Sequence, residues 1–317
     1  MPTTTTFAGV SARGEGFAHL LTLVFSGTPS TFTASTMPSS SNWYGVTYGN
    51  GYYVAVANGP TTAGAYSTDG ITWTASTMPS SRNWYSVTYG NGYFVAIATG
   101  TTAGAYSTNG TTWTASTMPS ASNWRSVTYG NGYFVATAYG QSAGAYSTNG
   151  TTWTASTMPS SSTWESVTYG NGYFVVVALG PTTAGAYSTN GTTWTASTMP
   201  SSSAWSGVTY GNGYFVAVAE NTTAGAYSTN GTTWTASTMP SSASWFGVTY
   251  GNGYFVTVAT GTTSAGAYST NGTTWTASTM PSASNWRSVT YGNGYFVAVQ
   301  DSGTTAGAYF AFTKSYV

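Results

Sequence analysis

The chain of 317 residues contains no cysteine. Neither disulfides nor thiolate metal sites can form, and the sequence carries no mark of the redox state of its compartment. Charge is also scarce, because Lys, Arg, Asp and Glu make up 3% of the sequence, with five basic and five acidic side chains. Such a chain lacks the basic surface that binds nucleic acid or an anionic membrane. We therefore expect neither partner.

Long hydrophobic runs are missing as well. The only apolar run, Leu20–Phe25, is interrupted by Thr22 and is far too short to span a bilayer. The first six residues, Met1–Thr6, contain none of the basic residues that open a signal peptide. We expect no membrane insertion, and we see no signal peptide.

Aromatic residues, in contrast, are abundant at 16% and recur at strict intervals, which is the opposite of a disordered composition. Nearly the same stretch, Trp84–Ser120 in its second copy, occurs seven times as a repeat unit. The first Trp residues of consecutive units are 40 or 41 residues apart: Trp43, Trp84, Trp124, Trp164, Trp205, Trp245 and Trp286. Repetition at this period predicts a repeat architecture.

Each unit contains four short segments of alternating or β-branched and aromatic character, which predict strands. In the second unit they are Trp84–Tyr89, Tyr93–Ala98, Ala103–Thr108 and Thr112–Thr117. The first two are joined through Asn91-Gly92, a pair that supplies the positive φ angles of a type I′ hairpin turn. We expect Pro119 to end the fourth strand, because proline donates no hydrogen bond to a ladder.

Four antiparallel strands per unit, seven times over, predict an all-β fold: a seven-bladed β-propeller of four-stranded antiparallel blades. The last unit lacks its fourth strand, whereas Thr31–Ser35 has the sequence of one. We therefore expect N- and C-terminal strands to close the ring in one blade. Leu20–Phe25 and Ala306–Phe312 both match the third strand of that blade, so one is surplus. We divide the chain into an N-terminal arm or attachment segment, residues 1–19, and the propeller, residues 20–317.

Two motifs carry a resemblance to known proteins. Ser67–Trp73, which reads Ser-Thr-Asp-Gly-Ile-Thr-Trp, resembles the Asp-box turn of sialidase-like propellers, although only Asp69 keeps the acid and the other copies have Asn. With the Gly-Asn-Gly-Tyr-Phe-Val-Ala-Val segment, the unit is similar to repeats of bacteriophage virion proteins and bacterial surface proteins. The resemblance implies a virion or extracellular surface location.

The seven units differ from one another at three places: the residue after the first Trp, the residues just before it, and the loop between the second and third strands. In an up-and-down blade these places lie at one end of the ring. Loops on a rigid scaffold usually carry recognition, and neutral drift of exposed loops is the alternative. The candidate ligand-binding residues of this variable face are Tyr44, Tyr85, Arg125, Glu165, Phe246, Arg287, Arg82 and Tyr139.

Catalytic chemistry is poorly provided for. Sialidase-like hydrolysis needs an arginine cluster, a nucleophile activated by a carboxylate and a second acid, whereas the acids here are dispersed over different units. The single histidine, His19, lies in the arm. We predict no enzymatic activity, no catalytic residue, no metal site and no cofactor.

These observations favour a non-enzymatic binding module on a virion or cell surface. Its variable face would recognise a glycan or a host surface receptor, and residues 1–19 would contact other virion proteins. The alternative is a structural decoration or assembly protein of a phage capsid or tail. A sialidase-like hydrolase is the minor alternative.

Overall fold

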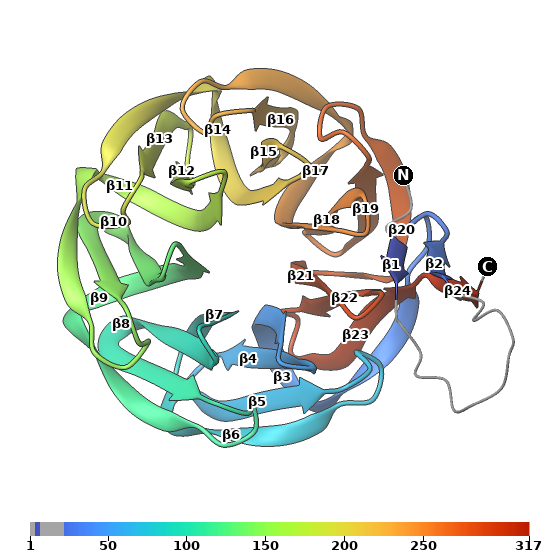
Figure 1. The fold of residues 1–317 in the computed structure, drawn as a ribbon, viewed down its shortest axis with the longest axis horizontal. Helices are drawn as coiled ribbons and strands as arrows, with labels where there is room; N and C mark the ends of the chain where they lie inside the picture. Colours follow the sequence, from blue (N-terminus) through green and yellow to red (C-terminus); the bar gives the residue numbers. More distant parts are fainter. Residues whose placement is uncertain (1–3, 7–21, 317) are drawn as a thin grey trace, which may run out of the picture.

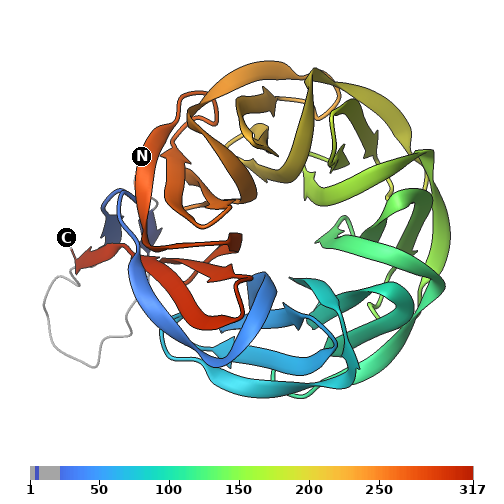
Figure 2. The ribbon, with the colours of Figure 1, turned by 180° about the vertical axis from the view of Figure 1, so that it is seen from behind.

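The computed structural model describes residues 4–6 and 22–316. Most of the predicted arm, residues 1–19, and its boundary at residue 20 lie outside these described ranges. Within these ranges the secondary-structure elements are all β-strands. The strands are arranged in groups around a common centre (Figure 1). The view from behind shows the same ring, with β1, β2 and β24 at its outer rim (Figure 2). The predicted all-β propeller architecture is confirmed.

The strands pair in three groups. A small sheet has the order β1-β2-β24: β1 (Thr4–Thr6), β2 (Thr22–Ser26) and β24 (Thr313–Tyr316). A seven-stranded sheet has the order β21-β22-β23-β3-β4-β5-β6: β21 (Trp286–Gly292), β22 (Tyr295–Gln300), β23 (Thr304–Ala311), β3 (Thr33–Gly49), β4 (Tyr52–Asn58), β5 (Thr61–Ser67) and β6 (Thr74–Arg82). A fourteen-stranded sheet runs from β20 back to β7: β7 (Trp84–Gly90), β8 (Tyr93–Ser107), β9 (Thr114–Gly130), β10 (Tyr133–Ser147), β11 (Thr154–Gly170), β12 (Tyr173–Ala178), β13 (Thr182–Ser188), β14 (Thr195–Gly211), β15 (Tyr214–Glu220), β16 (Thr222–Ser228), β17 (Thr235–Gly251), β18 (Tyr254–Thr260), β19 (Thr263–Ser269) and β20 (Thr276–Ser284).

The hairpin turn between the first two strands of the second unit follows the prediction. β7 and β8 pair as an antiparallel hairpin, with Gly90 opposite Tyr93. The turn residues Asn91 and Gly92 have φ angles of 48° and 82°, as a type I′ turn requires.

Proline does not end the fourth strand, and this prediction was wrong. β9 runs without a break through Pro119, joining the last strand of one unit to the first strand of the next. Pairing with β8 changes register on this stretch, between Thr117 opposite Ala103 and Ser122 opposite Thr101. Pro119 is exposed and has no partner in that register, so its missing N–H removes no ladder hydrogen bond.

The two ends of the chain meet in the last unit. β23 pairs with the start of β3, with Ala308 opposite Ala34. The surplus third strand is therefore the N-terminal one, because β2 pairs with β1 and β24 in the small sheet instead.

The core lies between neighbouring units. The first Trp of every unit is at most 1% exposed, and each shares a hydrophobic cluster with residues of its own and of an adjacent unit. Trp84 and Phe94, for example, share a cluster with Val54 of the preceding unit. Burying an aromatic side chain of this kind contributes about 1.5–3 kcal/mol, which offsets the scarcity of leucine and isoleucine.

Candidate functional site

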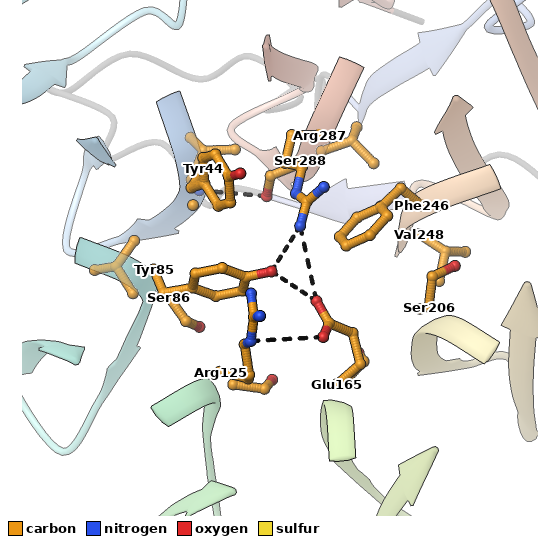
Figure 3. Close-up of a pocket in the computed structure, with 18 residues that line it drawn as sticks. Tyr44, Tyr85, Ser86, Arg125, Glu165, Ser206, Phe246, Val248, Arg287 and Ser288 are labelled. Atoms are coloured by element: carbon orange, nitrogen blue, oxygen red, sulfur yellow. Dashed lines mark hydrogen bonds and ion pairs between the residues drawn. The ribbon is translucent and has the colours of Figure 1, made fainter. Parts of the chain in front are cut away.

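The residue after the first Trp is a β-bulge in every unit. In the fourth unit Trp164 pairs with Ala178 and Ser166 with Val177, so Glu165 has no partner on the neighbouring strand. A bulge re-aims its side chain, and the seven bulged side chains converge on the channel at the centre of the ring (Figure 3). They line a cavity of about 140 Å³: Tyr44, Tyr85, Arg125, Glu165, Ser206, Phe246 and Arg287.

Arg287 occupies an aromatic cage. Its guanidinium carbon lies 3.7 Å from the ring centre of Phe246 and 4.4 Å from that of Tyr44. Two carboxylates balance its charge: Glu165, with Nη2 to Oε1 at 3.8 Å, and Asp301, with Nη1 to Oδ2 at 3.7 Å. Cation–π contacts in such a desolvated place are worth about 2 kcal/mol, so this side chain is firmly held.

Arg125 is sandwiched between two tyrosines. Its guanidinium carbon is 4.3 Å from the ring centre of Tyr85 and 4.5 Å from that of Tyr139. Its Nε lies 3.9 Å from Oε2 of Glu165. Each carboxylate oxygen of Glu165 therefore faces a different arginine.

Tyr85 connects these groups by hydrogen bonds. Its hydroxyl donates to Oε1 of Glu165 at 2.8 Å and accepts from Nη2 of Arg287 at 2.6 Å. Its ring packs edge-on against Tyr44, with 4.9 Å between the ring centres. We call these six residues the channel cluster: Tyr44, Tyr85, Arg125, Glu165, Phe246 and Arg287.

Burial dominates the electrostatics of the channel cluster. It raises the pKa of Glu165 above its ordinary value, although Arg125, Arg287 and the Tyr85 hydroxyl oppose the rise. Burial also raises the pKa of Tyr85, and the nearby Glu165 charge raises it further. The Tyr85 hydroxyl therefore stays protonated and donates its hydrogen bond to Glu165. Burial alone would lower the pKa of Arg287, but attraction from Tyr85 and Glu165 outweighs it and the pKa is raised.

Several buried polar atoms of the cluster are available for further contacts. Among the described residues, Oε2 of Glu165, Nε of Arg125, Nε of Arg287 and Oδ1 of Asp301 have no hydrogen-bond partner. Buried polar atoms are normally hydrogen-bonded to protein or water. The hydrogen-bonding capacity of these atoms of the cluster is therefore unused within the described part of the protein.

Six of the eight predicted site residues come together in the channel cluster, and Tyr139 joins them through Arg125. They are not a presented face as predicted, however, because Tyr85, Glu165 and Phe246 are buried. Arginine and carboxylate side chains from different units pair with one another there instead of facing solvent. The eighth residue, Arg82, lies apart in an exposed groove at the edge of the ring.

Asp301 and Glu220 belong to the same environment, although neither was selected as a site residue from the sequence. Asp301 pairs with Arg287, and burial raises the pKa of Glu220, with Arg287 and Glu165 also acting on it. Their common signal is a carboxylate in a loop between second and third strands, where other units have neutral residues.

Asp69 serves its own turn. Its Oδ1 accepts hydrogen bonds from the backbone N–H groups of Ile71 and Thr72, both at 2.8 Å. Asn109 does the same for Thr111 and Thr112 in the next unit. The acid therefore has the same role as the asparagines that replace it.

In the ranges 4–6 and 22–316, no group of three or more histidines, aspartates or glutamates is placed to hold a metal ion. The same ranges contain no helix with the length and hydropathy to cross a membrane.

The chain matches no protein-family profile and no curated protein sequence. Its fold is similar to that of solved β-propellers. Virginiamycin B lyase from Staphylococcus aureus is 13% identical, with a TM-score of 0.78 over 88% of this chain and 98% of that one. YCF48 bound to D1 peptide is 13% identical, with a TM-score of 0.70 over 90% of this chain and 96% of that one. At these identities the likeness establishes the fold alone.

The comparison corrects one prediction. The dispersed acids led us to expect a protein without enzymatic activity. That expectation was wrong as an exclusion, because virginiamycin B lyase, an enzyme, shares this fold.

Proposed function

We propose that this chain is a binding protein whose recognition site is the channel cluster and the loops around it. One observation carries the proposal: all seven units direct their most variable residue into one cavity, while the turns at the other end stay almost uniform. A structural ring needs no such difference between its ends.

The ligand we propose is a glycan or a surface protein. Aromatic rings such as Tyr44 and Tyr139, both half-buried, can stack on a sugar ring or a peptide side chain. Arg125 and Glu165 supply polar atoms for orientation. The cavity of about 140 Å³ is smaller than typical ligand pockets, which measure about 300–1,000 Å³. It therefore fits the end of a larger ligand that also rests on the surrounding loops.

The site presupposes a closed ring of seven blades, which is part of the proposal. Its support is a circle of isolated parallel bridges between the outer strands of successive units: Thr36 with Thr72, Thr77 with Thr112, Thr117 with Thr152, Thr157 with Thr193, Thr198 with Thr233, Thr238 with Thr274, and Thr31 with Thr279. The last bridge joins the N-terminal strand to the sixth unit, and Phe32 N donates to Thr279 O at 2.9 Å beside it.

We further propose that the protein acts on a virion or extracellular surface, with residues 1–19 as an attachment segment and residues 20–317 as the propeller. This rests on the similarity of the repeats and their Asp-box-like turns to those of virion and bacterial surface proteins. A capsid or tail decoration protein would share the location and the attachment segment, but would not need the channel cluster.

Binding of labelled protein to a glycan array and to candidate host cells tests the proposal. The variant Tyr44→Ala with Arg125→Ala removes two partly exposed channel side chains, and Thr111→Ala with Thr151→Ala is the control at the opposite end. We expect the channel variant to lose binding and the control to keep it, with both unfolding cooperatively. No binding by folded wild-type protein, together with its incorporation into particles through residues 1–19, would favour decoration instead.

A second candidate is glycoside hydrolysis, as the sialidase-like resemblance implies. The specific observation is the 2.8 Å hydrogen bond from Tyr85 to Glu165, flanked by Arg125 and Arg287. Sialidases use a tyrosine nucleophile, and a carboxylate hydrogen-bonded to the hydroxyl can activate it. Release of sialic acid from a fluorogenic sialoside by wild type, abolished in Tyr85→Phe and in Glu165→Gln, would establish this function. No release would remove it.

A further inference from the structure

Three equivalent grooves lie between neighbouring units at the loop end of the ring. One has a volume of about 300 Å³ and two have about 260 Å³. Each is formed by the segment just before a first Trp and by loops between second and third strands. The lining of the largest includes Pro60, Ser81, Arg82, Asn83, Thr99 and Thr101. Hydroxyl and amide groups dominate all three.

Arg82 makes the largest groove different from the others. It pairs with Thr61 where the third strand begins, and every unit has an equivalent of this position. The six equivalents are small and uncharged: Ser41, Ser122, Ser162, Ser203, Ala243 and Ser284. A single guanidinium thus stands in one of several otherwise similar neutral grooves.

The Arg82 guanidinium has no carboxylate partner among the described residues. Arg125 and Arg287 both lie within ion-pair distance of Glu165. The contact found for the Arg82 guanidinium is one hydrogen bond, from Nη1 to the carbonyl oxygen of Ser81 at 3.0 Å. A guanidinium has five N–H donors arranged as a fork that fits a carboxylate or sulfate. Most of that fork is therefore open to a ligand.

We propose that the groove at Arg82 binds a saccharide that carries an anionic group, either a carboxylate or a sulfate. Arg82 takes the anionic group, and Ser81, Asn83 and Thr99 take the sugar hydroxyls. The groove, at about 300 Å³, has the volume of a small ligand pocket, and among the described residues Arg82 is the only charged one that lines it. No acidic side chain in the lining opposes the anion. This inference rests on the proposed function, since it names the glycan class, but it concerns a site separate from the channel cluster.

Matched saccharides test it on the full-length protein. The probes are a disaccharide with a terminal glucuronate, the same disaccharide with glucose 6-sulfate, neutral cellobiose, and acetate as an anion without a sugar. Affinities are measured by NMR titration of ¹⁵N-labelled protein. We expect wild type to prefer an anionic disaccharide over cellobiose by about twofold to fivefold, the range for an exposed ion pair. The two anionic probes identify which group is preferred.

Two variants exchange the character of neighbouring grooves. Arg82→Ser gives the groove the residue of its equivalents, and we expect it to lose the preference while keeping its affinity for cellobiose. Ser41→Arg places a guanidinium in the groove formed by Ser40, Asn42 and Asn58, and we expect a second site with the same preference.

Equal affinity of wild type for anionic and neutral disaccharides, or an unchanged preference in Arg82→Ser, would overturn the inference. So would acetate that shifts the Arg82 signals as strongly as the anionic disaccharides at equal concentration. Each of these three results leaves the proposed function standing if the channel variant still loses ligand binding. If glycan and cell binding fail everywhere in wild type, the proposed function fails with it.

Discussion

Tyr53 in the first unit donates a hydrogen bond from its hydroxyl to the backbone carbonyl of Gly292 in the last unit. The same hydroxyl lies 3.4 Å from the carbonyl oxygen of Tyr295. At the equivalent position the other six units have a phenylalanine: Phe94, Phe134, Phe174, Phe215, Phe255 and Phe296. The one hydroxyl at this position therefore lies where the two ends of the chain meet. Its hydrogen bond links the first unit to the last unit, which the chain does not connect directly.

Removing that hydroxyl is expected to weaken the closure. Tyr53→Phe gives the first unit the residue of the others and leaves the Gly292 carbonyl without this donor. Losing such a hydrogen bond costs about 1 kcal/mol. Urea unfolding followed by tryptophan fluorescence measures the change in the free energy of unfolding. Tyr52→Phe, on the neighbouring half-buried tyrosine, is the control and should change little. An equal loss in both variants would refute a special role for Tyr53.

Glycine is required at position 130 because a neighbouring side chain leaves no room for a Cβ. A Cβ there would overlap the ring of Tyr169 in the following unit, so the two units could not approach as they do. We expect Gly130→Ala to cost about 3 kcal/mol, the upper range of overpacking. Gly132→Ala, two residues on, meets open space but has a φ of 83°, so it should cost about 1 kcal/mol for left-handed strain. Thermal unfolding compares the pair, and equal losses would contradict the close approach.

The sequence was sufficient to predict the structural features that recur in every unit, namely the strands and the turns between the first two of them. Strand alternation and the Asn-Gly turns are local signals, and seven copies reinforce them. The sequence did not predict where individual charges go. Glu165 is buried because Arg125 and Arg287, from two other units, approach it around the ring. No pattern within one unit contains that information.

Arg82 and Arg125 show the limit most clearly. One lies two residues before a first Trp and the other directly after one, so both count as variable residues of the same end. The bulge after Trp124 turns Arg125 inward to the channel cluster, whereas Arg82 ends β6 and stays exposed. Bulges depend on pairing between strands, which repeat periodicity does not report.

Asp69 makes the first unit sensitive to acid. Burial alone would raise its pKa, but hydrogen bonds from Thr72, Ile71 and Ser67 outweigh this and the pKa is lowered. A lowered carboxyl pKa gives stability that is present above the unfolded value of about 3.9 and is lost as the pH falls through the folded value. We therefore expect the melting temperature of wild type to fall more steeply than that of Asp69→Asn between about pH 5 and pH 2.

The reciprocal change is the control for this pH effect. Asn109→Asp places the acid in the equivalent turn of the second unit, where the Thr111 and Thr112 N–H groups already donate hydrogen bonds to the residue 109 side chain. It should add a second acid-sensitive contribution of the same sign. Parallel pH profiles of all three proteins would show that the turn carboxylate has no linkage to folding.

The pKa of Glu165 is shifted in the opposite direction to that of Asp69. Its pKa is raised by burial, so its folded state holds the proton more tightly than the unfolded chain does. Its contribution to stability is present below the unfolded value of about 4.3 and is lost as the pH rises through the raised folded value. Arg287 opposes the rise, because a nearby cation favours the carboxylate. Arg287→Met keeps much of the side-chain volume without the charge and should move the Glu165 pKa further up.

Carbon-13 NMR of the glutamate carboxyl groups can measure this directly, since the chain has three glutamates, Glu15, Glu165 and Glu220. Glu220→Gln assigns the other channel carboxyl, whose pKa burial also raises. Arg82→Met is the matched control, because Arg82 lines a separate groove and its loss should leave the Glu165 titration unchanged. A Glu165 carboxyl that titrates at or below its ordinary value in wild type would mean that Arg125 and Arg287, rather than burial, set its charge.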